Sequence, residues 1–441
     1  MDIPKSVQNV LETLEAAGHE AWCVGGCVRD SLLGRVPGDW DVTTNALPGE
    51  VLAVFGGRAL PTGLKHGTVT VKSEGESVEV TTYRVDGVYL DHRRPESVSF
   101  TRSIDEDLAR RDFTVNAMAV NLRGELRDPF GGREDLKYGD LRCVGDPDRR
   151  FQEDALRILR GMRFAAVLGL DEDDATKHAI DRNRELLRDI APERIQVELL
   201  KLLCGPYAKQ ALDNHPQVIG VFWPEVLPML HFDQRNIHHC YDVWEHSTVA
   251  LANTPPNPAL RCAAFLHDVG KPNSFTLDEN GVGHFYGHAS ISCRLTDAML
   301  QRLKFPTALR EQILRLVEWH DRLIYPTAKG LRRALRLLGE TDLRLLLDLK
   351  RADNLAQASA FRGRQEEIGH AERILGQLLE EDACFSLKHL AVRGSDLLTL
   401  GLSGPAVGAM LNRLLDQVVD GDLPNERDAL LRYAGDHLPQ G

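Results

Sequence analysis

The stretch from Trp22 to Ala46, WCVGGCVRDSLLGRVPGDWDVTTNA, constrains the fold of this chain more than any other segment. Its first residues predict a short buried strand, Gly25 and Gly26 predict a tight turn, and residues 28–33 predict a helix. A helix N-terminus behind a glycine turn presents unpaired N–H groups and the positive end of the helix dipole, and Arg29 adds a charge on the first turn. The stretch therefore predicts a phosphate cradle formed by Gly25, Gly26 and Arg29.

Two aspartates follow this cradle in a segment of strand-like composition, Asp39-Trp40-Asp41-Val42. The alternation of a strand places both aspartates on one face. Neighbouring carboxylates repel each other unless a cation lies between them, and oxygen ligands beside a phosphate cradle suit Mg²⁺. The glycine turn alone would be read as an ordinary turn, and the two aspartates alone as a solvated strand end, but the occurrence of both together favours a functional site. We expect Asp39 and Asp41 to be catalytic and to hold Mg²⁺.

The combined pattern GGxVRDxLLGxxPxDxDxxT resembles the signature of the class II tRNA nucleotidyltransferases and bacterial poly(A) polymerases, within the polymerase-beta-like nucleotidyltransferase superfamily. The resemblance implies template-independent addition of CCA to the 3′ end of tRNA, with CTP and ATP as substrates and tRNA as partner. An A-adding enzyme or a poly(A) polymerase is the near alternative. A nucleotide- or RNA-binding module with an inactive site is a second alternative, which the intact Asp39 and Asp41 disfavour.

Length and composition set the class of protein. A chain of 441 residues is too long for one core, and its length suggests about three domains. It holds no run of about 18 apolar residues, and its first residues predict an amphipathic helix and not a signal peptide. We therefore expect a multidomain cytoplasmic protein without a membrane partner. The eight scattered cysteines form no zinc-ligand pattern, so we expect thiols and not disulfides.

The formal net charge of −12 argues against a general affinity for nucleic acid, so an RNA site must be local. The segment from Arg84 to Arg163 holds 16 Lys plus Arg and 16 Asp plus Glu, and is therefore neutral within an acidic chain. The arginines are concentrated near the predicted site.

Three alternating segments, residues 58–60, 67–72 and 77–83, predict further strands of a small mixed sheet. Glu79 lies opposite the valines of the last segment, where it is either a third carboxylate beside Asp39 and Asp41 or a solvated strand residue.

The polar segment from Arg84 to Asp107 is too long for an ordinary connection, and loops of that length tend to be functional. Its residues Asp91, Arg93 and Arg94 resemble the flexible loop of CCA-adding enzymes, which the resemblance associates with addition of the final A. The alternative is a solvated charged loop.

The motif RRDFTVNA, from Arg110 to Ala117, is the second strong signal. Arg110 and Arg111 suit triphosphate oxygens. Asp112 and Asn116 lie four residues apart on a predicted helix, so both can contact ribose hydroxyls from one face. The motif matches the ribose-binding motif of the family.

Helical periodicity runs from Phe151 to Phe164, where polar residues recur every three positions as a ridge. A carboxylate and a guanidinium on one helix face can pair with the edge of a base. The resemblance implies that Asp154 and Arg157 accept ATP and CTP and reject UTP and GTP. We favour this interpretation over a salt-bridged surface ridge. The nucleotide-binding residues of this ridge are Asp154, Arg157, Arg160 and Arg163.

The second half of the chain carries histidines and aspartates on predicted helical segments. Imidazole and carboxylate groups suit a divalent ion that holds a water. A single helical histidine is more often a core residue, but the pair His267-Asp268 with distant partners resembles the HD phosphohydrolase superfamily. The resemblance implies the metal ligands His246, His267, Asp268 and Asp353, two further ligands, His288 and His320, and a phosphate-facing Lys271. It implies a site for Mg²⁺, Mn²⁺ or Ni²⁺, either in a phosphohydrolase or in a scaffold that retains its ligands.

We therefore expect an α+β fold, in which a small mixed-sheet head is followed by an all-helical neck, body and tail that include an HD domain. The predicted domains are a head at residues 1–142, a neck and body at 143–228, an HD domain at 229–365 and a tail at 366–441. Four arginines beyond the HD motif either follow an RNA backbone or belong to a solvated face, the second being the simpler interpretation. They are Arg332, Arg333, Arg336 and Arg344.

Overall fold

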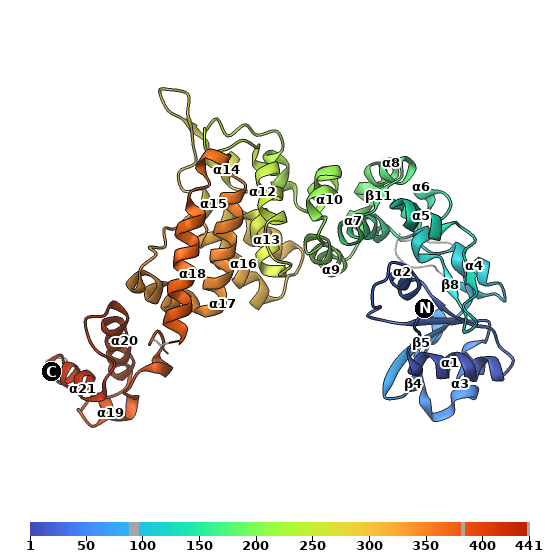
Figure 1. Ribbon diagram of the computed structural model, residues 1–441, viewed down its shortest axis with the longest axis horizontal. Helices are drawn as coiled ribbons and strands as arrows, with labels where there is room; N and C mark the ends of the chain where they lie inside the picture. Colours follow the sequence, from blue (N-terminus) through green and yellow to red (C-terminus); the bar gives the residue numbers. More distant parts are fainter. Residues whose placement is uncertain (88–96, 381–383, 439–441) are drawn as a thin grey trace. The chain divides into compact units, whose positions relative to one another are not determined.

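The computed structural model describes residues 1–87, 97–380 and 384–438, and the chain forms two compact units (Figure 1). The first unit contains residues 1–227 and 302–304, and the second contains residues 228–301 and 305–441. The predicted loop residues Asp91, Arg93 and Arg94 lie outside the described residues.

The head of the first unit is a seven-stranded mixed sheet with the strand order β3-β4-β5-β2-β1-β8-β9. All neighbours in this sheet are antiparallel except β2 and β5, which are parallel. A separate two-stranded ladder joins β6 to β7. The strands are β1 (Ala21–Val24), β2 (Asp41–Thr44), β3 (Ala59–Gly63), β4 (Thr68–Ser73), β5 (Glu76–Thr82), β6 (Arg84–Asp86), β7 (Val98–Phe100), β8 (Ala119–Val120) and β9 (Leu126–Arg127).

A two-residue turn joins β4 to β5. Ser73 pairs with Glu76, and the two residues between them, Glu74 and Gly75, have φ angles of 48° and 82°. Two positive φ angles are typical of the tight hairpin turns whose twist matches that of the strands.

Helices α1 and α3 pack against the sheet, where apolar side chains of both helices and of six strands form one core. A second cluster contains Tyr83, which is fully buried, together with residues of α4 and the strand β8. The head helices are α1 (Lys5–Ala16), α2 (Gly26–Leu32), α3 (Pro48–Phe55), α4 (Ile104–Ala109) and α5 (Gly132–Tyr138).

The rest of the first unit is mostly helical, with α7 packed against α9 and α10. Pro192 occupies the first turn of α9, as the helix-start signal predicts. These helices are α6 (Pro147–Glu153), α7 (Leu156–Leu168), α8 (Asp174–Asn183), α9 (Pro192–Leu203), α10 (Ala208–Asn214) and α11 (Pro216–Phe222).

The second unit is a helical bundle in which α13 contacts α12, α16 and α17, and α17 lies beside α18 (Figure 1). The helix α17 is interrupted at Gly339, where φ is 75°. Its helices are α12 (Val243–Ala252), α13 (Pro258–Leu266), α14 (Lys271–Ser274), α15 (His288–Arg302), α16 (Thr307–Trp319), α17 (Ala328–Leu355), α18 (Arg364–Glu380), α19 (Gly394–Leu398), α20 (Pro405–Asp420) and α21 (Arg427–Asp436).

The predicted fold class, a mixed-sheet head followed by a largely helical remainder, is confirmed. The prediction that the remainder is entirely helical was wrong, because two-residue strands form at β10 (Asp140–Leu141) with β11 (Asp171–Glu172) and at β12 (Thr276–Leu277) with β13 (Gly283–His284). Such strands are too short for side-chain alternation to reveal them. No disulfide joins any of the eight cysteines, all of which lie in the described ranges. Within the described ranges, no helix has both the length and the apolar character that crossing a membrane requires.

Candidate functional site

The glycine turn stands at the start of α2, which begins at Gly26 and not at residue 28 as predicted. Gly25 has a φ angle of 79°, which side chains rarely tolerate, and a Cβ atom there would lie 3.0 Å from Nη1 of Arg111. Gly25 is thus needed for its backbone angle and for the close approach of an arginine. Its N–H donates to the carbonyl of Met118 on the loop before β8, at 3.1 Å.

Four carboxylates, those of Asp39, Asp41, Glu76 and Glu79, line one cavity of about 640 Å³ beside this turn. Asp41 opens β2 and is paired in register with Glu79 on the parallel neighbour β5, so both side chains project from the same face. Asp39 precedes the strand instead of lying within it, a difference from the prediction, but it lines the same cavity. Burial raises the pKa of Asp41, as do Glu79 and Asp39, while Arg111 opposes the rise. This is the like-charge arrangement that a cation relieves.

The two neighbouring arginines of the second motif have different surroundings. Arg110 donates to the buried Asp107 at 2.8–2.9 Å and lies 3.9 Å from Asp86. Arg111 lies 3.5 Å from Asp107, and its Nε atom has no hydrogen-bond partner among the described residues. Of the two arginines, Arg111 is therefore the one that lies near the glycine turn and the Asp41 carboxylate, and its Nε donor remains available for a ligand.

The prediction of a helix through Asp112 and Asn116 was wrong, because Phe113 bridges to Cys143 and only residues 114–116 form a single 3₁₀ turn. Asn116 still contacts Asp112, donating from Nδ2 to Oδ1 at 3.1 Å. Asp112 also accepts two bonds from Arg160, at 2.8 and 2.6 Å. Burial would raise the pKa of Asp112, but the nearby guanidinium groups lower it below the usual range.

The predicted continuous helix from Phe151 to Phe164 was also wrong. It is broken between α6 and α7 at Asp154, where φ is −138° and ψ is 104°. The side chain of Asp154 stabilises this break by accepting from the backbone N–H of Leu156 at 3.1 Å. Its second oxygen accepts from Arg194 at 3.2 Å. Aspartate competes with helical hydrogen bonding in this way, which residue periodicity does not reveal.

The arginines of the predicted ridge contact protein groups and are not laid out along a solvated surface. Arg157 is 9% exposed and donates to Glu153, to the carbonyl of Arg110 and to the carbonyl of Arg150. Arg163 lies 3.1 Å from Glu198 on α9.

Phe164, near the C-terminal half of α7, is a contact residue that sequence reasoning missed. Three guanidinium groups stack on its buried ring, those of Arg29, Arg160 and Arg163, at 5.2, 5.3 and 4.1 Å from the ring centre. Arg29 also donates to Asn116 at 2.6 Å. The aromatic ring thus connects the glycine turn to the ridge.

The second unit brings together all six predicted ligands of the HD site. Ligand atoms of His246, His267 and Asp268 lie within 4.8 Å of one another, and those of Asp268, His288 and His320 do the same. Asp353 joins the first group through Nε2 of His246, at 3.0 Å. Asp268 belongs to both groups.

Each histidine of this cluster has its Nδ1 atom next to a backbone carbonyl. The distances are 3.3 Å for His246, 2.8 Å for His267, 2.9 Å for His288 and 2.6 Å for His320. Donation from Nδ1 leaves the Nε2 lone pair free and turned toward the centre, which is the tautomer that binds a metal. Nε2 of His267 has no hydrogen-bond partner among the described residues. Burial lowers the pKa of His267, but the carboxylates of Asp268 and Asp353 outweigh it and raise the pKa to about 10. The two carboxylates therefore favour a positive charge at this position, which a divalent ion would supply in place of the proton. These residues fit a metal ion.

Two further residues flank the cluster. Lys271 contacts Asp268 at 2.6 Å and Gln234 at 2.9 Å, so its ammonium group already pairs with a predicted ligand. The ring of His239 lies 5.2 Å from that of His246, and burial with the nearby Lys271 lowers its pKa to about 3. Sequence reasoning missed His239 because it stands in the loop before α12, outside any periodic pattern.

Three of the four arginines considered as an RNA track form ion pairs, which favours the solvated face. Arg333 contacts Asp420 at 2.5 Å, Arg336 contacts Asp416 at 2.6 Å, and Arg344 contacts Glu340 at 2.9 Å.

Comparison with known proteins decides the family. The sequence patterns of three families match this chain, the Poly A polymerase head domain at residues 21–142, the probable RNA and SrmB-binding site of polymerase A at 169–214 and the HD domain at 236–358. The CCA-adding enzyme of Bacillus cereus is 34% identical over 439 residues, which cover 97% of each chain. This chain belongs to the CCA-adding enzyme family. The predicted enzyme class, a CCA tRNA nucleotidyltransferase, is thereby confirmed.

Other members of the CCA-adding enzyme family agree with this. That of Anoxybacillus flavithermus is 54% identical over 204 residues, 46% of this chain and 51% of the relative. A crystal structure of the CCA-adding enzyme of Bacillus stearothermophilus in complex with CTP superposes with a TM-score of 0.73, at 30% identity and over 99% of this chain and 98% of that one. The Thermotoga maritima CCA-adding enzyme complexed with tRNA, at 20% identity and a TM-score of 0.56, shares the fold.

Proposed function

We propose that this chain adds C, C and A to the 3′ end of tRNA without a template, with CTP and ATP as substrates. The similarity to CCA-adding enzymes over nearly the whole chain supports the reaction. The observation that carries the site assignment is the parallel register of Asp41 with Glu79, in a cavity that Asp39 also lines. We propose the cytoplasm as the place of this activity, because tRNA and both nucleotides occur there together.

Asp39 and Asp41 would hold Mg²⁺, with Glu79 as a third oxygen ligand. The ion supplies a Lewis acid that lowers the pKa of the 3′-hydroxyl and stabilises the charge on the leaving pyrophosphate. Carboxylate oxygens are the ligands that Mg²⁺ prefers, and the raised pKa of Asp41 supports a need for positive charge there.

The chain's own residues bind and orient the nucleotide. Gly25, Gly26, Arg29 and Arg111 bind the triphosphate, since N–H groups at a helix N-terminus and arginines match phosphate oxygens. The 3′-hydroxyl oxygen bonds to the α-phosphorus, the bond from that phosphorus to the pyrophosphate breaks, and the hydroxyl proton passes to water. The remaining assigned nucleotide-binding residues are Arg110 toward the triphosphate, Asp112 and Asn116 toward the ribose, and Asp154, Arg157, Arg160 and Arg163 toward the base.

The experiment that tests this function uses tRNA that ends at the residue before CCA. Incubation with CTP alone, ATP alone or both, followed by sequencing of the 3′ ends, should give CC, no addition and CCA. A matched Asp41→Asn protein should add nothing, while Asp140→Asn, at an exposed residue of β10 that does not line the cavity, should retain addition. Incorporation of A alone would assign an A-adding enzyme or a poly(A) polymerase, and unchanged ends would overturn the proposal.

We also propose that the second unit hydrolyses phosphoesters such as 2′,3′-cyclic or 2′-phosphates. The observation in favour is that all four histidines have Nδ1 against a carbonyl and Nε2 at 3.2–3.7 Å from a carboxylate oxygen of Asp268. The ligands fit Mg²⁺, Mn²⁺ or Ni²⁺, and such an ion makes hydroxide available from a bound water near neutral pH. The water oxygen bonds to phosphorus, the ester P–O bond breaks, and the leaving oxygen takes the proton that the water loses.

Equilibrium dialysis with Mn²⁺ and hydrolysis of 2′,3′-cyclic AMP test this second activity. His267→Ala combined with Asp268→Ala should abolish both metal uptake and hydrolysis and spare CCA addition, and Asp41→Asn should have the opposite effect. A wild-type protein that takes up none of the three ions at this site and leaves the cyclic phosphate intact would show that the domain is a scaffold.

A further inference from the structure

The ring of Phe164 closes a circuit of contacts through the two residues assigned to the ribose. Oδ1 of Asn116 accepts a hydrogen bond from Nη1 of Arg29 at 2.6 Å, and Nδ2 of Asn116 donates to Oδ1 of Asp112 at 3.1 Å. The other oxygen of Asp112 accepts from Nε and Nη2 of Arg160, at 2.8 and 2.6 Å. Arg29 and Arg160 then meet on the ring of Phe164, at 5.2 and 5.3 Å from its centre. Each of the five side chains therefore has two neighbours in the circuit.

The circuit joins three segments that are distant in the sequence. Arg29 belongs to α2 behind the glycine turn, whereas Asp112 and Asn116 precede β8. Arg160 and Phe164 lie one turn apart on α7. Asp112, Asn116 and Phe164 are buried. Because charge-assisted and cation–π contacts are stronger where water is excluded, the circuit fixes the orientation of the side chains in it.

The ring also gathers three positive charges, each of which pairs with one carboxylate. The pairs are Arg29 with Asp30 at 2.8 Å, Arg160 with Asp112 at 2.6 Å and Arg163 with Glu198 at 3.1 Å. Three guanidinium groups that share one ring repel one another. The negative face of an aromatic ring offsets this repulsion, whereas an aliphatic side chain would be apolar but would present no such face. These contacts therefore depend on the aromatic character of Phe164.

We propose that Phe164 is a positioning residue for recognition of the ribose. It holds Arg29 and Arg160, and through these two arginines it orients Asn116 and Asp112 toward the hydroxyl groups of the incoming nucleotide. The proposal rests on the nucleotide addition proposed for this chain and on the assignment of Asp112 and Asn116 to the ribose. A displacement of about 1 Å is enough to lose a positioned contact, so removal of the ring should weaken the preference for ribonucleotides over 2′-deoxyribonucleotides.

The test compares CTP with 2′-deoxyCTP in addition to tRNA that ends at the residue before CCA. Phe164→Leu keeps an apolar side chain and removes the ring. The kcat/KM for CTP divided by that for 2′-deoxyCTP should fall about tenfold, which corresponds to ~1.4 kcal/mol and to the loss of one or two desolvated cation–π contacts. Both substrates should bind less tightly through Arg29, but only CTP loses a contact to its 2′-hydroxyl. If 2′-deoxyCTP is not incorporated, its inhibition constant is compared with the KM of CTP.

A conservative variant provides the rescue. Phe164→Tyr retains the ring and should keep most of the preference for CTP. Thermal unfolding of every variant sets an assay temperature at which all of them are folded. If Phe164→Leu unfolds below that temperature, Phe164→Met, which fills irregular space more readily, takes its place.

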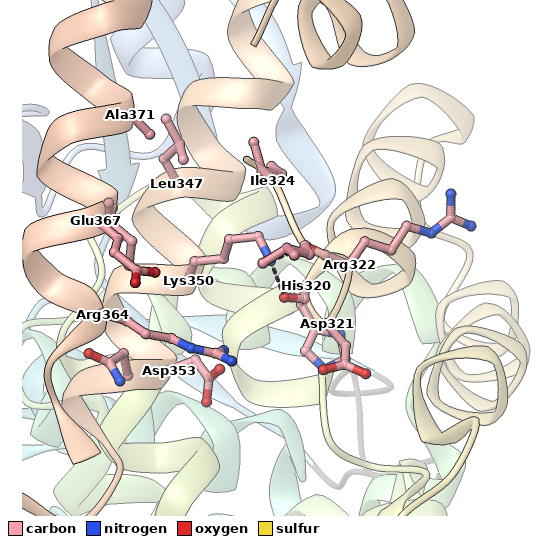
Figure 2. A pocket seen from close by; sticks show the side chains of 13 residues that line it. His320, Asp321, Arg322, Ile324, Leu347, Lys350, Asp353, Arg364, Glu367 and Ala371 are labelled. Atoms are coloured by element: carbon pink, nitrogen blue, oxygen red, sulfur yellow. Dashed lines mark hydrogen bonds between the residues drawn. The ribbon is translucent and has the colours of Figure 1, made fainter. Parts of the chain in front are cut away.

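Two controls separate positioning from stability. Phe222 of α11 is a buried phenylalanine of the same unit, and its ring packs edge-on against Trp223 at 5.9 Å. Leu347 of α17 is buried in the second unit, in the wall of a cavity beside the HD cluster (Figure 2). Phe222→Leu and Leu347→Ala should each lower Tm, because they remove buried apolar contacts, and should leave the preference for CTP at the wild-type value.

The outcomes distinguish this inference from the proposed function. If wild-type protein adds CTP and Phe164→Leu keeps the wild-type preference, Phe164 is only a core residue and the inference is overturned, while the function stands. The inference is also overturned if Phe164→Tyr loses the preference as Phe164→Leu does, or if Phe222→Leu and Leu347→Ala lose it equally. If wild-type protein adds no nucleotide, the proposed function fails, and calorimetric binding of CTP and 2′-deoxyCTP to wild type and Phe164→Leu then decides the inference by the same ratio.

Discussion

Replacing Arg157 by alanine tests whether the region proposed to select the base also stabilises the first unit. The guanidinium group is 9% exposed and donates to Glu153 at 2.8 Å, to the carbonyl of Arg110 at 2.9 Å and to that of Arg150 at 3.2 Å. Glu153 keeps Arg150 as a partner at 3.0 Å, so its charge is not left alone. The loss is therefore one charge-assisted bond and an unsatisfied carbonyl, about 2–4 kcal/mol in the free energy of unfolding.

Thermal unfolding followed by circular dichroism measures this loss. For a unit of this size, about 2–4 kcal/mol corresponds to a fall of roughly 4–16 °C in Tm. The control is Arg149→Ala, because Arg149 contacts the same Glu153 at 3.2 Å from a side chain that is 74% exposed. An exposed pair contributes about 1 kcal/mol or less. Equal Tm values for the two variants would refute the assignment of a structural role to Arg157.

The same variants separate stability from selectivity. Among the described residues, Asp154, with 19% of its side chain exposed, pairs with Arg194 and with the backbone at the helix break, so Asp154→Ala should lower Tm less than Arg157→Ala. Both should incorporate UTP and GTP more readily relative to CTP and ATP, because a base edge loses its partner. Incorporation of each nucleotide into tRNA at a temperature where all variants are folded measures this. Wild-type selectivity in Asp154→Ala would limit that residue to the helix break.

Three further predictions concern other regions. Gly25→Ala should cost about 1 kcal/mol in stability because of the positive φ angle, and it should reduce nucleotide addition because the new Cβ would contact Arg111. Gly34→Ala is the control: its φ angle is 69° and no atom lies near, so it should affect stability alone. The neighbouring Asp181 raises the pKa of His215, although burial lowers it. Protonated His215 should therefore stabilise the fold fully below its unfolded pKa of about 6.5, and this stabilisation should disappear as the pH rises through the folded pKa. Chemical denaturation of His215→Gln should accordingly show a larger loss of unfolding free energy at pH 6 than at pH 9. His267→Ala should abolish Mn²⁺ uptake measured by dialysis while CCA addition stays at the wild-type rate.

The sequence predicted those parts of the site that depend on local patterns. Strand alternation left two interpretations of Glu79, a third carboxylate or a solvated strand residue, and the regular pairing of β2 with β5 places it beside Asp41. The resemblance to the HD superfamily predicted the HD cluster, whose members His246 and Asp353 meet through the packing of α12 on α17.

The parts that failed depend on side-chain competition with the backbone and on tertiary burial. Periodicity counts Asp154 as helical, although its carboxylate satisfies the N–H two residues later and ends α6. It counts Arg157 as a ridge residue, although tertiary carbonyls surround it.

The turn between β4 and β5 has a consequence for how this enzyme fails. Its two residues fix which positions of β5 oppose β4, and the same register carries Glu79 to Asp41 on the other side of β5. A slip of one residue turns every side chain of a strand to the opposite face. One residue inserted between Glu74 and Gly75 would therefore produce chains that retain much of their helical circular dichroism but in which Glu79 no longer lies beside Asp41. Catalytic activity thus measures the fraction of chains in which this hairpin has formed in the correct register.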